Sequence, residues 1–329
     1  MNPNSLATVP RACLTVDLDS MACYRAIHGL GSAEEGAPRP DADRAYSVGV
    51  RRLLDFFGQA GVPATLFVVG SDTERPAHAE LLGEAVESGH ELGNHTYSHF
   101  YDLPRRGEAT RLAELARAED AIAKISGRRP VGYRAPGYNI SPEILDMLAE
   151  RGYLYDSSIF SCPPYYLAKA AIMGWQKLSG RPSRSAMVAP ETLLAPLTPY
   201  RPSRAHIWRS DPNSDLPWEI PMCVVPGVRF PVIGTSLQLM GATGFDAVFP
   251  LLRRAHPRLF QLEFHAIDFM DADDLRGAEN AAELIAAQPD LRVSWPRKRA
   301  IYRHVISRLR ADYLFSTLED AIISGGISA

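Results

Sequence analysis

The stretch A-C-L-T-V-D-L-D-S, residues 12–20, places a short apolar run directly before two carboxylates. Residues 12–16 are predicted to form a strand, and Asp17 and Asp19 follow at its end. Side chains two residues apart point to the same side of an extended chain, so these carboxylates lie together. They repel one another unless a cation or a shared proton lies between them. The pair therefore indicates a metal site or acid–base chemistry, although a solvated D-x-D turn is the plain alternative.

Short β-rich runs alternate with helical patterns along most of the chain. This alternation is typical of a parallel sheet, whose strands all end on one face. We therefore expect an α/β fold in which one barrel-like domain spans residues 1–329. After the first strand, the pattern predicts strands at 64–69, 131–134, 153–158, 218–225, 228–233 and 259–265, and helices at 46–58, 77–88, 108–126, 142–152, 236–254, 274–287, 297–309 and 317–323.

Residues 161–217 break this alternation and are dense in Pro, Arg and Ser. The segment is too long for a plain connection, so we expect an insertion that covers the active-site face. Its first part mixes Tyr165, Met173 and Trp175 with Lys169 and Lys177. That mixture suits a lipid interface, and equally a helix packed on the barrel with a solvated outer face. The first alternative predicts peripheral contact with a membrane or with a lipid-linked substrate.

A second polar cluster, G-N-H-T-Y-S-H at residues 93–99, contains His95 and His99. In a helical turn, residues four apart share one face, so both imidazoles would point the same way. Two imidazoles and one carboxylate are a familiar ligand set for catalytic zinc or a similar divalent ion. We therefore expect a divalent metal, with Zn²⁺ as the first choice.

Three further polar residues stand at predicted strand ends. Arg134 lies in G-Y-R-A-P-G-Y-N (132–139), Asp156 in Y-D-S-S (155–158), and His265 in L-E-F-H-A-I-D-F (262–269), where Glu263 precedes it by two residues. Taken singly, Arg134 is equally well explained by a surface charge and His265 by a structural role. In the functional alternative, a fixed Arg orients a nearby carboxylate and holds it ionised.

The ordered set of motifs resembles the polysaccharide deacetylase family, which are metal-dependent carbohydrate esterases. H-T-Y-S-H (95–99) and R-A-P-G-Y (134–138) are its specific parts. The resemblance covers residues 12–160, resumes at 218–265 and includes F-S-T-L-E-D-A at 315–321. It implies a distorted, incomplete (β/α) barrel and hydrolysis of an N-acyl group. Leu18 separates the two aspartates, as in the D-x-D branch, which includes peptidoglycan-deacetylase-like proteins and amidohydrolases of small cyclic substrates.

The resemblance also implies a role for each polar residue. The metal would be held by three ligands, namely Asp19, His95 and His99. The catalytic group would comprise Asp17 as the general base, Arg134 beside it, His265 as the general acid, and Asp156 as an orienting partner for His265.

Substrate contacts are expected from Tyr138 and from two later segments, W-E-I-P-M (218–222) and G-V-R-F-P-V-I-G (227–234), which resemble strand pairs beside the site in D-x-D relatives. Their charged members are Glu219 and Arg229, and a buried ion pair is an equal alternative for these two. The leading function is removal of acetyl or formyl from an amino sugar on a glycan or lipid-linked saccharide. The alternatives are hydrolysis of small cyclic amides or imides, and non-catalytic sugar or lipid binding. A binding protein would not need the acid and the base.

The composition excludes several classes of protein. Hydrophobic residues make up 46% and charged residues 22% of the chain, and the net charge is −3, which is ordinary for a globular protein. The chain has no lysine-rich tract, so we expect no nucleic-acid partner. It also lacks an apolar window of about 18 residues and a basic start, so we expect neither a membrane span nor a signal peptide. Four scattered cysteines, interpreted as buried thiols, favour the cytoplasm or its membrane surface, and a homo-oligomer is left open.

Overall fold

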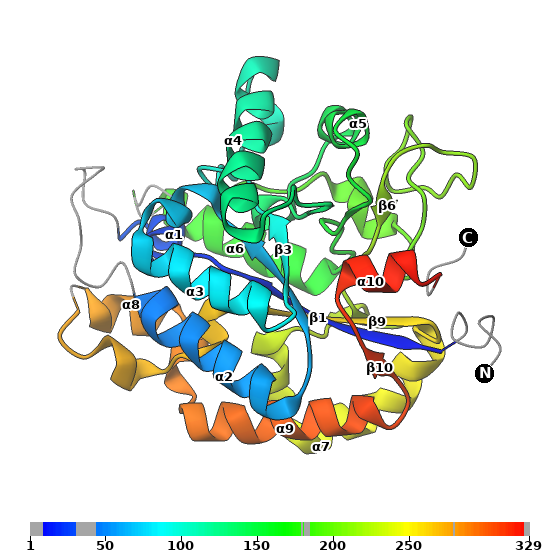
Figure 1. Ribbon diagram of the computed structural model, residues 1–329. Coiled ribbons are helices and arrows are strands. Elements are labelled where there is room, and N and C mark those ends of the chain that lie inside the picture. Colours follow the sequence, from blue (N-terminus) through cyan, green and yellow to red (C-terminus); the bar gives the residue numbers. More distant parts are fainter. Residues whose placement is uncertain (1–8, 31–43, 179, 181–184, 279, 326–329) are drawn as a thin grey trace.

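The computed structural model describes residues 9–30, 44–178, 180, 185–278 and 280–325. Its centre is a parallel sheet with the strand order β10-β1-β2-β3-β4-β5-β6, in which β9 also pairs with β1 (Figure 1). The sheet curls into a half-barrel covered by helices, which confirms the predicted fold class. The strands are β1 (Arg11–Asp17), β2 (Ala64–Val68), β3 (Glu91–Asn94), β4 (Gly132–Tyr133), β5 (Tyr155–Asp156), β6 (Trp218–Glu219), β9 (Leu259–His265) and β10 (Leu314–Phe315).

Strand β1 lies in the middle of this sheet. It pairs with β9 along its whole length, so that Asp17 stands directly opposite His265. Two strands share its other edge: β10 pairs with residues 11–12, and β2 pairs with residues 14–17. The strand is buried from its second residue onward. Burial on both faces explains why this strand is mostly apolar rather than strictly alternating.

Helices cover the sheet (Figure 1). The helix predicted at 108–126 is confirmed to the residue, and it ends where Gly127 adopts a φ of 73° and donates its N–H to the carbonyl of Ala123. The main apolar core includes side chains of α2, α7, α9 and strands β1, β2 and β9. The helices are α1 (Met21–His28), α2 (Arg51–Ala60), α3 (Pro76–Glu87), α4 (Glu108–Ser126), α5 (Pro142–Glu150), α6 (Pro163–Leu178), α7 (Gly234–Ala255), α8 (Ala281–Ala287), α9 (Trp295–Arg310) and α10 (Leu318–Ile323).

Three predicted elements differ from the structure. The strand expected at 218–225 is split into β6 and β7 (Val224–Val225), because Pro221 between them has no N–H to continue the ladder. The helix expected at 274–287 begins only at Ala281, after Gly277 (φ 75°) and Asn280 (φ 54°) interrupt it. The helix expected at 46–58 starts as a π-helical turn, residues 45–50, in which Gly49 packs against the backbone of Ala266. A Cβ at position 49 would lie 2.6 Å from that carbonyl oxygen.

The segment expected to be an insertion, residues 161–217, contains more regular structure than its composition indicates. It includes α6 and a 3₁₀ turn at Pro190–Leu194, and Tyr200 forms an antiparallel bridge to Glu219 of β6. Its residues 179 and 181–184 lie outside the described residues. Elements that we did not predict are α1, β3, α6 and β10, of which α1 and α6 flank the site described next. Across the described ranges, no helix is both long and apolar enough to cross a membrane.

Candidate active site

The C-terminal ends of β1, β4 and β9 bring three predicted residues together. Arg134 follows β4, and its guanidinium donates to Oδ1 of Asp17 at 2.7 Å. It also donates to Thr15, to the hydroxyl of Ser157 at 2.9 Å and to the carbonyl of Ser157 at 2.8 Å, and it is fully buried. These bonds fix both the cation and the carboxylate that it faces. Oδ2 of Asp17 is left to face the histidines, with His95 Nε2 and His265 Nε2 each 3.9 Å away.

We predict that Arg134→Lys lowers both stability and activity. A lysine retains the charge but cannot reach Asp17, Thr15 and Ser157 together, because it lacks the planar fork of an arginine. Breaking one side of a buried ion pair costs about 3–5 kcal/mol, so the free energy of unfolding should fall by at least about 2 kcal/mol. Urea unfolding measures this loss. Arg128→Lys, at an exposed pair with Glu319, is the control and should stay within about 0.5 kcal/mol of the wild type.

The predicted metal ligands also meet in the structure. Oδ1 of Asp19 lies 2.9 Å from Nε2 of His99 and 3.5 Å from Nε2 of His95. Nδ1 of His95 is 2.7 Å from the carbonyl oxygen of Arg134. A carbonyl only accepts hydrogen bonds, so Nδ1 carries a proton and the ring is held with Nε2 toward Asp19. This arrangement, with one ring nitrogen held and the other free, is typical of metal-binding histidines.

The spacing of the two histidines predicted a helical turn, but they do not lie on one. They follow β3 in a loop in which Thr96 (φ 63°) and His99 (φ 55°) have left-handed backbones. The side chain of Asn94 stabilises this loop by accepting the N–H of Thr96 at 2.7 Å. Strained residues of this kind cluster at functional sites because the surrounding structure holds them in place. Within the described ranges five residues other than glycine have a positive φ, and three of them, Thr96, His99 and Tyr138, belong to this region.

The donor atoms fit a divalent cation. Oδ1 of Asp19 and Nε2 of His99 are buried and make no hydrogen bond, which is costly unless another group completes the site. Burial would raise the pKa of Asp19, but His99 and His95 outweigh it and hold that pKa well below its usual range. An ionised carboxylate between two imidazoles is a suitable ligand set for Zn²⁺. Sequence analysis missed a fourth candidate, Cys23 of α1, whose Sγ lies within 4.8 Å of the ligand atoms of Asp19 and His99.

On the other side of Asp17, His265 stands in an acidic environment. Its neighbours are Asp17 and Glu263, and ligand atoms of all three lie within 4.8 Å of one another. Burial lowers the pKa of His265, but Glu263 and Asp17 outweigh it and raise that pKa to about 9. The imidazole is therefore protonated at neutral pH. Asp268, which sequence analysis also missed, accepts the backbone N–H of His265 at 2.8 Å and anchors this strand end.

The structure gives Asp156 and Glu219 a different role from the predicted ones. The interactions of Asp156 are with Ser158 and Glu219, while the carboxyl groups next to His265 are Asp17, Glu263 and Asp268. Asp156 is therefore not an orienting partner of His265. Glu219 is buried beside it, where its Oε1 accepts the N–H of Ile159 at 2.9 Å. The two are register partners on β5 and β6, which sequence alone does not place side by side.

We predict that Glu219→Gln reduces the loss of stability with rising pH. Burial, together with Asp156, raises the pKa of Glu219 well above its usual range, and burial raises the pKa of Asp156 to about 6. Because folding raises both pKa values, the folded state binds more protons, and stability falls as the pH rises through about 6. The slope is about 1.4 kcal/mol per pH unit for each proton. Gln keeps the acceptor for Ile159 and has no proton to lose, so urea unfolding from pH 5 to 8 should show a shallower decline.

Glu219→Ala is the control and should lose about 1–3 kcal/mol throughout, because it leaves the N–H of Ile159 without an acceptor. Identical pH profiles for the wild type and the Gln variant would contradict the raised pKa of Glu219 in the folded protein.

The structure also places Tyr138 and Arg229 in different surroundings. Tyr138 lines the cavity that contains Asp17 and His265, and its hydroxyl donates to Oε1 of Glu263 at 2.7 Å. Arg229, in contrast, donates to the carbonyl oxygens of Leu193 and Ala195, and it is not among the residues that line the two cavities described below. The contact of Arg229 with substrate stays a prediction. Its guanidinium connects the segment 227–234 to residues 193 and 195 of the insertion.

Comparisons with known proteins find similarity to one family. The family model described as "Polysaccharide deacetylase" matches residues 42–155. Over these residues the chain is similar to the polysaccharide deacetylase family. It is 31% identical to a peptidoglycan deacetylase of Helicobacter pylori over 154 residues, which cover 46% of this chain and 51% of that one. It is 33% identical to a chitin deacetylase of Arthroderma benhamiae over 110 residues, or 32% of this chain and 29% of that one. The chain thus matches about half or less of the length of these relatives.

Two solved structures share the fold of this chain. One is the "probable polysaccharide deacetylase" of Pseudomonas aeruginosa PAO1, with a TM-score of 0.57 and 18% identity, covering 98% of this chain and 92% of that one. The other is the Puue allantoinase, with a TM-score of 0.57 and 16% identity, covering 97% and 90%. Both structures match nearly the whole chain, so the shared fold extends well beyond residues 42–155.

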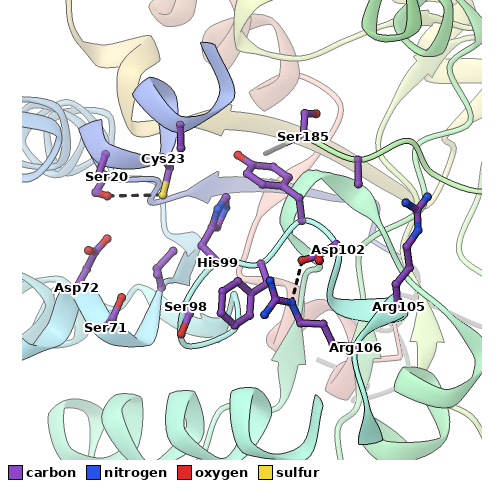
Figure 2. Close-up of a pocket in the computed structure, with 16 residues that line it drawn as sticks. Ser20, Cys23, Ser71, Asp72, Ser98, His99, Asp102, Arg105, Arg106 and Ser185 are labelled. Atoms are coloured by element: carbon purple, nitrogen blue, oxygen red, sulfur yellow. Dashed lines mark hydrogen bonds and ion pairs between the residues drawn. The ribbon is translucent and has the colours of Figure 1, made fainter. Parts of the chain in front are cut away.

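Two cavities meet at the candidate catalytic residues. A polar cleft of about 730 Å³ runs past His99 and Cys23, which face one another in Figure 2, and continues between serines on one side and Arg105 and Arg106 on the other. A second cavity, of about 400 Å³, contains Asp17, Asp19, His95 and His265 and is walled by α1 and α6. Helix α6 belongs to the segment 161–217, whose role as a cover of the active-site face stays a prediction. On the outer face of α6, Leu167, Trp175 and Leu178 are exposed, and peripheral contact with a membrane stays a prediction.

Proposed function

We propose that this protein is a metal-dependent hydrolase that removes an N-acyl group from an amino sugar of a glycan. The observation that carries the proposal is the position of Asp17. One oxygen is locked by Arg134, and the other lies 3.9 Å from both His95 and His265, between the metal-ligand set and a protonated imidazole. The deacetylase relatives named above support the class of substrate.

The cofactor that fits this site best is Zn²⁺, held by Asp19, His95 and His99, with Cys23 close enough to join them. When bound, such an ion polarises an amide carbonyl and lowers the pKa of a coordinated water. The chain supplies the remaining groups. The free oxygen of Asp17 is placed to accept a proton, because its other oxygen is occupied by Arg134.

Cleavage of an amide also needs a proton donor, since an amine leaves poorly until it is protonated. His265 is protonated at neutral pH, and its Nε2 lies as close to Oδ2 of Asp17 as that of His95 does. Glu263 and Asp17 keep it charged, and Tyr138 holds Glu263 in place by donating to its Oε1. The base and the acid thus belong to separate residues, each with its own fixed neighbour.

The polar cleft suits the saccharide part of the substrate. Its lining includes hydroxyl groups of Ser20, Ser71 and Ser98 and the rings of Phe100 and Tyr101. Hydroxyl groups form hydrogen bonds with sugars, and aromatic rings offer flat apolar faces. We place the protein in the cytoplasm, because its four described cysteines form no disulfide.

Metal analysis combined with an amine-release assay tests this function. The substrates are N-acetyl and N-formyl amino sugars, as monomers and as oligomers, and the control is Asp17→Asn. We expect about one equivalent of divalent metal in both proteins and amine release only by the wild type. Metal without release of any of these amines would favour a cyclic amide as the substrate, and a metal-free protein would refute the catalytic proposal.

A further inference from the structure

The cavity that contains the catalytic residues is larger and more apolar than an acetyl group requires. Its volume is about 400 Å³. An acetyl group has three non-hydrogen atoms, and at about 30 Å³ for each water-sized group it fills only about a quarter of that space. Much of the remaining wall is aliphatic, and includes Ile27 of α1, Ile172 and Met173 of α6, Ile233 and Ile267. An acetyl group alone would leave this wall in contact with water.

Helix α6 presents one continuous face to this cavity. The lining residues Tyr165, Ala168, Lys169, Ile172, Met173 and Gln176 follow the three- and four-residue spacing of a helix face. The two long polar side chains among them are already engaged. Lys169 donates to the carbonyl of Gly137 at 3.3 Å, and Gln176 donates to the carbonyl of Ile27 at 3.0 Å. The second bond ties α6 to α1 across the cavity.

The apolar wall extends from the catalytic residues to the surface. Asp17 and His95 line the same cavity as Ile172, whose exposed fraction is 53%. A chain attached to the carbonyl carbon of a bound amide can therefore follow α6 outward. The polar cleft, which His99 lines, offers the saccharide a place next to this cavity, since Tyr101 and Ser185 line both. The two cavities thus divide an amphipathic substrate at its amide bond.

We propose that the acyl group removed by this enzyme is a medium-length fatty acyl chain, which lies in the cavity between α1 and α6. This inference rests on the proposed function and specifies its substrate. The reaction is hydrolysis: a water oxygen forms a bond to the carbonyl carbon, the C–N bond breaks, and the nitrogen gains a proton. The products are the free amino sugar and a fatty carboxylate.

The test measures kcat/KM for glucosamine carrying N-acetyl, N-butyryl, N-hexanoyl or N-octanoyl groups. Each methylene buried in an apolar site raises kcat/KM by roughly threefold. We expect a rise of at least roughly a hundredfold from acetyl to octanoyl. Met173→Asp should lower the octanoyl-to-acetyl ratio at least tenfold, and Ala168→Phe should shift the preferred acyl chain to a shorter one. Leu167→Asp, on the exposed outer face of the same helix, is the matched control and should keep the ratio.

The outcomes separate the two proposals. A flat or falling series, with N-acetylglucosamine still hydrolysed, would overturn the fatty-acyl inference and leave the proposed function standing. The octyl glycoside of N-acetylglucosamine is a further arm: if its octyl group accelerates hydrolysis and the N-octanoyl group does not, the cavity holds a lipid aglycone and the inference is wrong. If no amide is hydrolysed, the proposed function fails. Calorimetric titration with octanoate then decides whether the cavity takes an aliphatic chain, since Met173→Asp should abolish that binding and Leu167→Asp should not.

Discussion

Replacing His95 by Ala removes the metal and at least about 10⁴-fold of the activity, because a bound divalent ion contributes several kcal/mol to the stabilisation of the transition state. His95 is the ligand nearest to the base, with its Nε2 at 3.5 Å from Asp19 and 3.9 Å from Asp17. Its Nδ1 is held by the carbonyl of Arg134, which fixes the direction of Nε2.

Two measurements test this prediction. Elemental analysis after gel filtration should give less than about a tenth of the wild-type metal content, which corresponds to a loss of affinity of more than 10-fold, as expected for a lost ligand. The control is His304→Ala, which removes an exposed histidine paired with Asp246 and should leave metal and activity unchanged. If His95→Ala retains a full equivalent of metal, then Asp19, His99 and Cys23 form the site without it.

Replacing His265 by Ala has a different signature, because this residue acts on the proton and not on the metal. The variant should keep its metal and lose about 10²- to 10⁴-fold in kcat, which is the usual contribution of a general acid. The pH profile gives a second readout. The pKa of His265 is raised to about 9, so the protonated form is present at neutral pH and is lost as the pH rises through about 9. The wild-type rate should therefore fall above about pH 9.

In His265→Ala this basic limb of the profile should disappear, since the group that titrates is gone. Addition of imidazole to the assay should restore part of the rate, because a small acid can occupy the vacated volume. Equal metal loss in His95→Ala and His265→Ala would contradict the division of roles between the two histidines. An unchanged basic limb in His265→Ala would assign the acid to another residue.

The sequence contained enough information to predict the strands that carry the chemistry. The strand before Asp17 and the strand before His265 are both buried, so their apolar runs stand out clearly, and the parallel rule places their ends together. The helix at 108–126 is framed by helix-forming residues and a terminal glycine. Local signals of this kind survive folding because tertiary contacts reinforce them.

Other parts of the site depend on contacts that no local pattern reveals. Asp156 and Glu219 are paired only because β5 and β6 lie in register, and the segment between them is an insertion of irregular composition. Cys23 reaches the ligand set through α1, a helix of eight residues that is too short to give a strong periodic signal. The loop that carries His95 and His99 contains residues with left-handed backbones, whereas the four-residue spacing alone predicted a helical turn.

The pairing of β1 also has a consequence for the order in which the protein can assemble during synthesis. The first strand is covered on one edge by β9 and on part of the other by β10, and Cys13 bonds to a carbonyl 304 positions later. A ribosome releases the N-terminal strand long before either partner exists. Contacts between such distant segments slow folding, because a long loop must close before they form. The emerging chain therefore carries an uncovered, apolar strand edge for most of its synthesis, and loss of the last strand would leave part of that edge open in the finished protein.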